Sequence, residues 1–319
     1  MNQTLEPITE LLTGIYGSPK TAKSSIMLTV PKPMVVFDLD QSFSRAQARL
    51  VALEPNLKIL IIRPHEKPSM DSWKTYLDTY DVIVRQYNIP LRMPGTLLAG
   101  YIDLWEGLII PEMICATEHP RILSICLDTG TLWWTMDHQS QLERAQQNSK
   151  VERSSLLPIE YARPNTEARA LLGNIRNKGK NLVSVHHVGP KHGPGYEEKR
   201  SRNKVELVYK EDMLLGETWA GFTHLAAIVD VIARSRLENY CNTCQAWFEP
   251  TLINSFQHPL QGVGVHQVNT TLVPTLTIEY CGYALEATNG HLPNPSFDIL
   301  LGYINGMRAL QMANIANGK

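Results

Sequence analysis

The segment Gly17-Ser18-Pro19-Lys20-Thr21-Ala22-Lys23-Ser24 decides the fold that the sequence predicts. It has the first glycine, the lysine and the hydroxyl residue of the phosphate-binding motif G-x-x-x-x-G-K-[ST], with Ala22 in place of the second glycine. In that motif a turn between a strand and a helix points backbone N–H groups at a phosphate, and the helix N-terminus adds partial positive charge. We expect residues 11–16 to supply the strand and residues 24–30 to open the helix.

Each position of this Walker A motif has an expected role. Lys23 is expected to reach the β- and γ-phosphates of a nucleotide, and the Ser24 hydroxyl to help hold Mg²⁺. A methyl group at Ala22 is costly if the backbone takes a positive φ, but alanine is tolerated if this residue has helical angles. The alternative is a chance surface turn followed by a helix. The residues expected around the nucleotide are Gly17, Ser18, Pro19, Lys20, Thr21, Ala22, Lys23, Ser24 and Ser25.

Short apolar runs alternate with stretches of helical character up to residue 187. The runs have strand length and are rich in β-branched residues, and they lie at 34–40, 57–62, 122–127 and 181–187. Helices are expected at 71–86, 100–116, 131–147 and 165–177. Such alternation predicts an α/β fold in which helices flank a mostly parallel, twisted sheet.

The pattern changes after residue 187. Residues 189–204 are rich in Gly, Pro and basic residues, so we expect a mobile loop there, followed by a strand at 228–238. The elements expected beyond it are β-like segments at 262–268 and 272–280 and a helix at 296–313. The predicted domain organisation is a core at 1–250 with an insertion at about 42–120, then a small mixed C-terminal extension at 251–319.

Composition limits the class of protein. With 319 residues, 43% hydrophobic and 19% charged, the chain can bury one large core, or one core with a small appended unit. A net charge of -1 excludes a histone-like polybasic protein, so nucleic-acid binding requires a local basic segment. The sequence shows neither a secretory signal pattern nor a long apolar stretch, and we expect a cytoplasmic protein without a membrane span.

Cysteine usage agrees with a reducing compartment. Five cysteines, an odd and low number, do not form a disulfide framework. Cys241 and Cys244 are the only close pair, and no second pair follows at zinc-finger spacing. We therefore expect an ordinary hairpin at this pair rather than a zinc site.

Acidic residues end two of the predicted strands. Asp128 fits the Walker B position, in which a strand next to the first ends in an aspartate that orients the water on Mg²⁺; it also fits a helix N-cap, and the two roles can coexist. Asp38 and Asp40 end another strand at the edge where ligands bind in open α/β sheets. We expect only one of the two to point at the nucleotide, and we favour Asp40 as the residue that positions the attacking water. The alternative for either is a structural cap.

Histidines and arginines supply further candidates. His186 and His187 end the fourth strand, where a polar side chain can sense the γ-phosphate; we favour His187, and the alternative is a histidine bound to a backbone carbonyl. Arg234 and Arg236 alternate on one strand. Either can act as an arginine finger on a neighbouring subunit, or both mark an exposed strand face.

The predicted loop after His187 is basic. A flexible basic segment suits sequence-independent contact with single-stranded DNA, and Tyr196 can stack on a base. Glu197 and Glu198 reduce the local charge, so a solvated surface loop is the alternative. The residues expected to contact DNA are Lys191, His192, Tyr196, Lys199, Arg200, Arg202 and Lys204.

Four segments together, at 16–24, 31–40, 122–131 and 174–190, resemble the RecA-like P-loop ATPases of phages and prophages. This AAA-type nucleotide-binding group includes phage single-strand-annealing ATPases. The resemblance covers about residues 11–240. It implies a RecA-like core that binds ATP and Mg²⁺, and a homo-oligomeric ring or filament with the site at a subunit interface. It also implies that Asp40 is the catalytic acid and His187 the sensor.

The resulting hypothesis is an ATP-binding and ATP-hydrolysing protein of phage or prophage DNA recombination, repair or replication, with a loop that contacts single-stranded DNA. Two alternatives stay open. One is a regulatory or structural module that binds nucleotide without turnover, and the other is a P-loop kinase. Ala22 and the insertion are the departures from the family pattern, and the insertion leaves the geometry of the oligomer open.

Overall fold

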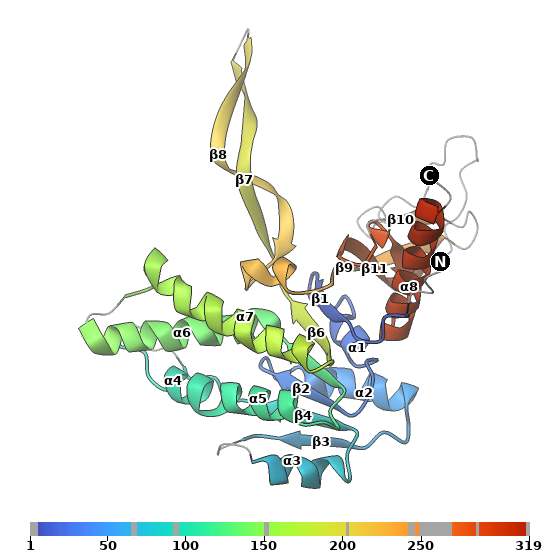
Figure 1. The fold of residues 1–319 in the computed structure, drawn as a ribbon. Helices are drawn as coiled ribbons and strands as arrows, with labels where there is room; N and C mark the ends of the chain where they lie inside the picture. Colours follow the sequence, from blue (N-terminus) through green and yellow to red (C-terminus); the bar gives the residue numbers. More distant parts are fainter. Residues whose placement is uncertain are drawn as a thin grey trace.

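A large sheet forms the centre of the computed structural model (Figure 1). The residues that the structure describes are 6–64, 69–91, 96–149, 153–201, 204–241, 246–248, 270–284 and 287–316. The strands of the sheet are β1 (Leu12–Tyr16), β2 (Met34–Asp38), β3 (Ile59–Ile62), β4 (Val82–Gln86), β5 (Ser124–Asp128), β6 (Asn181–His186), β9 (Val231–Cys241), β10 (Ala246–Phe248), β11 (Thr270–Cys281) and β12 (His291–Pro293). A separate hairpin consists of β7 (Val188–Ser201) and β8 (Lys204–Trp219).

Nine of the ten strands follow the order β12-β11-β9-β1-β6-β5-β2-β4-β3, and β10 pairs with β9 outside this path. The seven strands from β9 to β3 are parallel, whereas β10, β11 and β12 pair in the antiparallel sense. The prediction of an α/β fold with a mostly parallel sheet and a mixed C-terminal part is confirmed. Parallel pairing also brings the carboxyl ends of seven strands to one edge.

Helices cover both faces of the sheet. They are α1 (Lys23–Met27), α2 (Phe43–Leu53), α3 (Met70–Leu77), α4 (Tyr101–Leu104), the π-helix η1 (Trp105–Ile109), α5 (Ile110–Glu118), α6 (Gly130–Ser149), α7 (Ala162–Asn177) and α8 (Phe297–Ala316), with short 3-10 turns η2 (Pro158–Tyr161) and η3 (Thr223–Ala227). Because strand residues alternate between faces, Val35 and Phe37 of β2 join the core under α3 to α7. Met34 and Val36 join the opposite core, under α1, α2 and α8.

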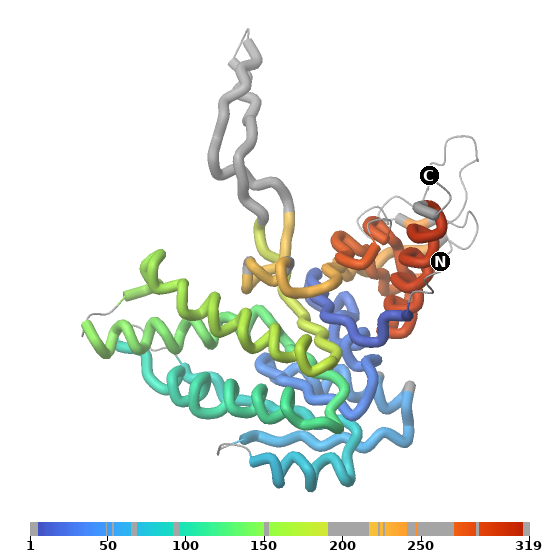
Figure 2. Tube along the Cα trace, in the orientation of Figure 1, coloured from blue at the N-terminus to red at the C-terminus, as the bar shows by residue number. Residues whose placement is uncertain are grey.

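The C-terminal segment is continuous with this sheet. β11 pairs with β9 along its whole length, and Phe297, Leu300 and Ile304 of α8 lie in the same core as α1 and α2. The first described residues lie beside α8 (Figure 2). Ile8 N–H donates there to the Asn305 side chain at 2.9 Å. The domain boundary near residue 250 stays a prediction. Within the described residues, none of the helices combines the length and the apolar character needed to cross a membrane.

Two element predictions are wrong. The helix expected at 71–86 ends at Leu77, and 82–86 is the buried strand β4, because Val82-Ile83-Val84 is a β-branched run that is apolar toward both faces. The loop expected at 189–204 is part of the β7–β8 hairpin. Its glycines and prolines coincide with register shifts, between Lys191 and His192 and between Gly193 and Gly195, which mark β-bulges.

Asp137 lies in the interior of α6. It is fully buried, and neither carboxylate oxygen has a hydrogen-bond partner among the described residues. Burial first, and then the charge of Glu167, raises the pKa of Asp137 to about 8. The folded protein therefore keeps this carboxyl protonated at neutral pH, whereas the unfolded chain ionises it above its ordinary pKa of 3.8. Its contribution to stability falls as pH rises from there toward 8.

We expect Asp137→Asn to stabilise the protein by an amount that grows between about pH 5 and pH 8, because asparagine does not ionise. The difference in unfolding free energy between variant and wild type grows by at most about 1.4 kcal/mol per pH unit. Urea unfolding of variant and wild type at both ends of this range measures it. Asp298→Asn, at an exposed aspartate in the first turn of α8, is the control and should change the unfolding free energy by the same amount at pH 5 and at pH 8. A constant difference between Asp137→Asn and wild type contradicts the prediction.

Candidate functional site

The predicted phosphate loop is a turn between β1 and α1 at the carboxyl edge of the sheet. A Cβ on Gly17 would stand 2.2 Å from the backbone oxygen of Ser235 in β9, so only glycine fits there. The Ser235 hydroxyl donates to the Thr21 carbonyl at 2.5 Å, and the Thr21 hydroxyl donates to the Ser18 carbonyl at 2.9 Å. Strand β9 and a hydrogen bond within the loop thus fix its shape.

Lys23 and Ser24 point toward acidic residues. Lys23 is 8% exposed, and its ammonium donates to the carbonyls of Gly17 and Ser18, both at 2.7 Å. Burial lowers the pKa of Lys23, while the charges of Asp128 and Asp40 act in the opposite direction. The Ser24 hydroxyl is close enough to Asp128 to lower the pKa of that carboxyl. The lysine and the hydroxyl of the motif therefore lie in the field of these carboxylates.

Ala22 takes a left-handed conformation, with φ 67° and ψ 16°. The sequence left two possibilities open at this residue, helical angles or a positive φ, and the structure shows the positive φ. Left-handed backbone costs an L-residue about 1–2 kcal/mol, which glycine avoids. Lys20 also has a positive φ, of 65°. Pro19 and Lys20 complete the turn, and Ser25 lies in the first turn of α1.

Three carboxylates meet next to the loop. Asp38, Asp40 and Asp128 each offer an oxygen, and these oxygens all lie within 4.8 Å of one another. In the parallel register Asp38 of β2 lies opposite Asp128 of β5. The expectation that only one of Asp38 and Asp40 would point here is wrong, because residues two apart lie on the same side of an extended chain. The expectation that the Asp128 strand neighbours β1 is also wrong, since β6 lies between them.

Asp38 is the capping residue of α2. Its carboxylate accepts the N–H groups of Ser42 at 2.9 Å and Phe43 at 3.1 Å, and the Gln86 amide donates to it at 2.8 Å. Burial raises the pKa of Asp38 to about 6, against the effect of these hydrogen bonds. Asp40 is partly exposed and accepts from the Ser42 N–H at 2.9 Å. Of the two, Asp40 is the carboxylate that reaches solvent.

Asp128 is buried at the centre of the cluster. Burial first, and then the charge of Asp40, raises its pKa to about 7, while the hydroxyls of Ser24 and Ser42 lower it. Ser42 donates to it at 3.2 Å. Sequence reasoning missed Ser42, although its place just after D-L-D-Q identifies it as the start of the next helix. Carboxylate and hydroxyl oxygens are ligands that Mg²⁺ prefers, and the residues present fit such an ion.

The two histidines differ in environment. His186 ends β6 and is buried, with Nε2 2.8 Å from the Ser184 hydroxyl oxygen and Nδ1 3.2 Å from the Ala220 carbonyl. Burial lowers its pKa to about 4, so the ring is neutral at physiological pH. His187 lies beyond the strand and is exposed. The contacts of His186 match the alternative of a histidine bound to a backbone carbonyl.

Hydrogen bonds join the acidic edge to the base of the hairpin. The His187 N–H donates to the Thr131 hydroxyl at 3.0 Å, and that hydroxyl donates to the Ala220 carbonyl at 2.8 Å. Ala220 N–H donates in turn to the His187 carbonyl at 2.8 Å. A Cβ on Gly130 would stand 2.2 Å from the Ser184 hydroxyl, so glycine lets α6 start this close to β6.

The remaining predicted residues lie farther along the chain. Arg234 pairs with Glu217 of the same chain and lies 5.9 Å over the Tyr16 ring; Arg236 lies opposite Thr275 of β11. The predicted DNA-contact residues in the hairpin are Lys191, His192, Tyr196, Lys199 and Arg200 in β7 and Lys204 in β8. Cys241 ends β9, which pairs with β10. Arg202, Cys244 and the segment 262–268 lie outside the described residues.

Two of the three comparisons with known proteins found no match. No protein-family model matches the chain. No curated protein matches it. Among solved structures, the crystal structure of the RadB recombinase is similar, with 11% sequence identity, a TM-score of 0.36, and coverage of 85% of this chain and 81% of that chain. The class of the site is therefore defined by the loop and the three carboxylates.

We expect Ala22→Gly to raise the free energy of unfolding by about 0.5–1 kcal/mol, because it relieves the left-handed alanine at some cost in chain entropy. Gly17→Ala should have the opposite sign, since its methyl group meets the Ser235 carbonyl. Urea unfolding measures both. Ala46→Gly, inside α2, is the control and should destabilise by about 1 kcal/mol. An Ala22→Gly protein no more stable than wild type would contradict the assigned conformation.

Proposed function

We propose that the chain is a Mg²⁺-dependent P-loop nucleoside triphosphatase of the RecA-like class that binds and hydrolyses ATP. One observation carries the proposal: the turn with Lys23 and Ser24 and the cluster of Asp38, Asp40 and Asp128 lie together at the carboxyl edge of a parallel sheet, and the charges of Asp128 and Asp40 act on Lys23. Ligands bind at this edge in open α/β sheets. A lysine, a hydroxyl and carboxylates next to a tight turn are the groups that a magnesium nucleotide requires.

In this proposal the phosphates lie over residues 17–25. The ammonium of Lys23 leaves the carbonyls of Gly17 and Ser18 and contacts the β- and γ-phosphates. Ser24, and Asp128 through a water, would hold Mg²⁺, which when bound neutralises phosphate charge. The raised pKa values of Asp38 and Asp128 support a cation here, because burial makes a second and third negative charge costly unless a positive charge lies among them.

Asp40 is the residue that we propose to position the attacking water. It is the most solvent-accessible member of the cluster, and the Ser42 N–H orients one of its oxygens. His187 is the proposed γ-phosphate sensor. Its main chain binds Thr131, which follows Asp128 by three residues, and Ala220, at the base of the hairpin. A change near the phosphates can thereby reach β7 and β8.

The proposed partners are single-stranded DNA and further copies of the chain. The β7–β8 hairpin begins directly after the sensor segment, and its sequence carries the basic residues named above, which suits contact with a phosphate backbone. Arg234 or Arg236 would act on a neighbouring subunit; Arg234 must first leave Glu217. The setting that fits these features is phage or prophage DNA recombination in the host cytoplasm.

Two substitutions separate nucleotide binding from hydrolysis. Lys23→Ala should weaken ATP binding by about 10- to 100-fold, because it removes a charge-assisted contact. Asp40→Asn should keep ATP binding and lower kcat by about 100-fold or more. Calorimetry and phosphate release measure the two effects, with Lys178→Ala, an exposed lysine paired with Glu118, as the control. If hydrolysis is measurable and Asp40→Asn leaves it unchanged, the assignment of Asp40 is wrong.

The hairpin is tested by its salt dependence. We expect single-stranded oligonucleotide to stimulate hydrolysis and to bind more weakly as salt rises. Replacing Lys191, Lys199 and Arg200 together by alanine should lower the slope of log affinity against log salt by about two, and should leave ATP binding in the absence of DNA unchanged. Fluorescence anisotropy of a labelled oligonucleotide measures the slope. Absence of binding at low salt would exclude the DNA-contact role.

A further inference from the structure

Ser42 is the residue at which the three carboxylates of the site meet. Its main-chain N–H donates to one oxygen of Asp38 and to one oxygen of Asp40, both at 2.9 Å. Its hydroxyl donates to Asp128 at 3.2 Å. The residue is 9% exposed, so bulk water has little access to these contacts. A single residue therefore connects the acids that follow β2 with the acid that ends β5.

The Ser42 hydroxyl does not serve the helix that it precedes. A serine at this position of a helix ordinarily accepts an N–H group of the first turn, and that bond stabilises the helix. The Ser42 side chain makes no such bond to the described residues of α2. The Asp38 carboxylate caps the helix instead, through the N–H groups of Ser42 and Phe43. The contact with Asp128 is thus the role that the structure gives to this hydroxyl.

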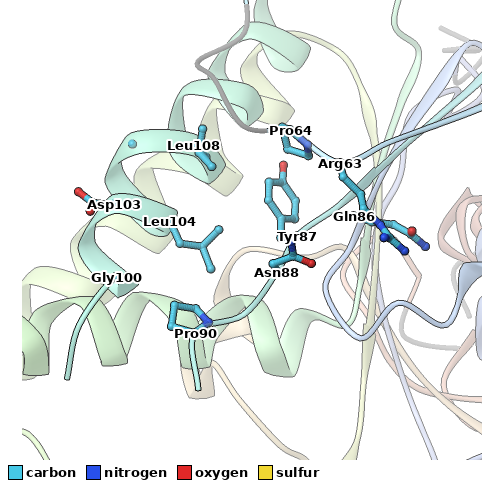
Figure 3. A pocket seen from close by; sticks show the side chains of 11 residues that line it. Arg63, Pro64, Gln86, Tyr87, Asn88, Pro90, Gly100, Asp103, Leu104 and Leu108 are labelled. Atoms are coloured by element: carbon cyan, nitrogen blue, oxygen red, sulfur yellow. The ribbon is translucent and has the colours of Figure 1, made fainter. Parts of the chain in front are cut away.

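The turn that precedes Ser42 is held from strand β4. Gln41 has a left-handed backbone with φ 54°, a conformation that is unfavourable for an L-residue. Its side-chain amide donates to the Tyr87 carbonyl at 3.1 Å and anchors the turn. Gln86, which ends β4 next to Tyr87 (Figure 3), donates to Asp38 at 2.8 Å. Contacts with the sheet, and not α2 alone, therefore fix where Ser42 lies.

We propose that Ser42 is a positioning residue of the ATPase site, which holds Asp40, the residue assigned to the attacking water, at a fixed place relative to Asp128 on the Mg²⁺ side. The inference rests on the proposed function. Groups that act on one substrate must keep their mutual geometry, since a displacement of about 1 Å can lower a rate by about 100-fold. Loss of a hydrogen bond to a carboxylate near a metal ion costs about 10- to 100-fold in metal affinity or activity.

Ser42→Ala tests the proposal, because it removes the hydroxyl and keeps the N–H. We expect it to weaken binding of Mn²⁺ alone by about tenfold, and to lower kcat for ATP by about tenfold or more. KM for ATP should stay unchanged, since residues 17–25 are untouched. Electron paramagnetic resonance measures Mn²⁺ binding, and phosphate release measures hydrolysis. Ser42→Thr, which keeps a hydroxyl, should restore both.

Thermal stability separates this role from a structural one. The Ser69 hydroxyl does cap its helix, since it accepts the Ser72 N–H at the start of α3 at 3.1 Å. Ser69→Ala should therefore lower the melting temperature by about 2 °C and leave Mn²⁺ binding and kcat unchanged. Ser42→Ala should do the reverse. If Ser42→Ala does not fold, the comparison of Ser42→Thr with Ser42→Val, which has nearly the same shape, isolates the hydroxyl.

The outcomes that overturn the proposal are distinct from those that overturn the ATPase. A Ser42→Ala protein that binds Mn²⁺ as tightly as wild type, or Thr and Val variants that behave alike, would show that Ser42 does not position the cluster. A wild-type protein that binds Mn²⁺ and does not hydrolyse ATP would instead refute the proposed hydrolysis. The Mn²⁺ comparison would then still decide whether Ser42 holds the carboxylates in place.

Discussion

The burial of Asp128 among like charges is the constraint on which the rest of the site depends. Its carboxylate is buried at the sheet edge with Asp38 and Asp40 close by, and hydroxyls and one ammonium offset the repulsion. Ser24 and Lys23 supply two of these groups from the loop, and Ser42 supplies a hydroxyl from the start of α2. The loop and the carboxylates therefore stabilise each other. Without the other group, the Lys23 ammonium or the Asp128 carboxylate would be a buried and uncompensated charge.

The carboxyl edge of the sheet, where the carboxylates meet, also carries the base of the β7–β8 hairpin. Thr131 lies in the first turn of α6, just after Asp128, and its hydroxyl binds both the His187 N–H and the Ala220 carbonyl. The buried ring of His186 contacts the same Ala220 carbonyl and stays neutral. These contacts, mostly to backbone groups, join the first turn of α6 to the base of the β7–β8 hairpin.

Much of the fold could be predicted because it follows from local patterns. Apolar runs that ended in Asp38 and Asp128 identified β2 and β5, and the loop segment identified β1 and α1. Strand β4 was missed because its three β-branched residues follow the end of α3 after only residues 78–81. The hairpin was missed because a segment rich in glycine and charge lacks the alternation of apolar and polar residues by which a strand is identified. The left-handed conformation of Ala22 depends on a contact that is distant in sequence, because the Ser235 hydroxyl donates to the carbonyl of the preceding Thr21.

The sequence identified residues that the structure brings together at one edge of the sheet, but it did not show which contacts each residue makes. Sequence spacing places Asp38 and Asp40 on one side of an extended chain. The structure adds that the Asp38 carboxylate accepts the N–H groups of Ser42 and Phe43 and so caps the start of α2. Gln86 of β4 donates to the same carboxylate, so three donors on two elements fix Asp38 in the cluster. Because these hydrogen bonds lower the pKa of Asp38 and burial raises it, loss of the Gln86 amide would raise this pKa further above its value of about 6.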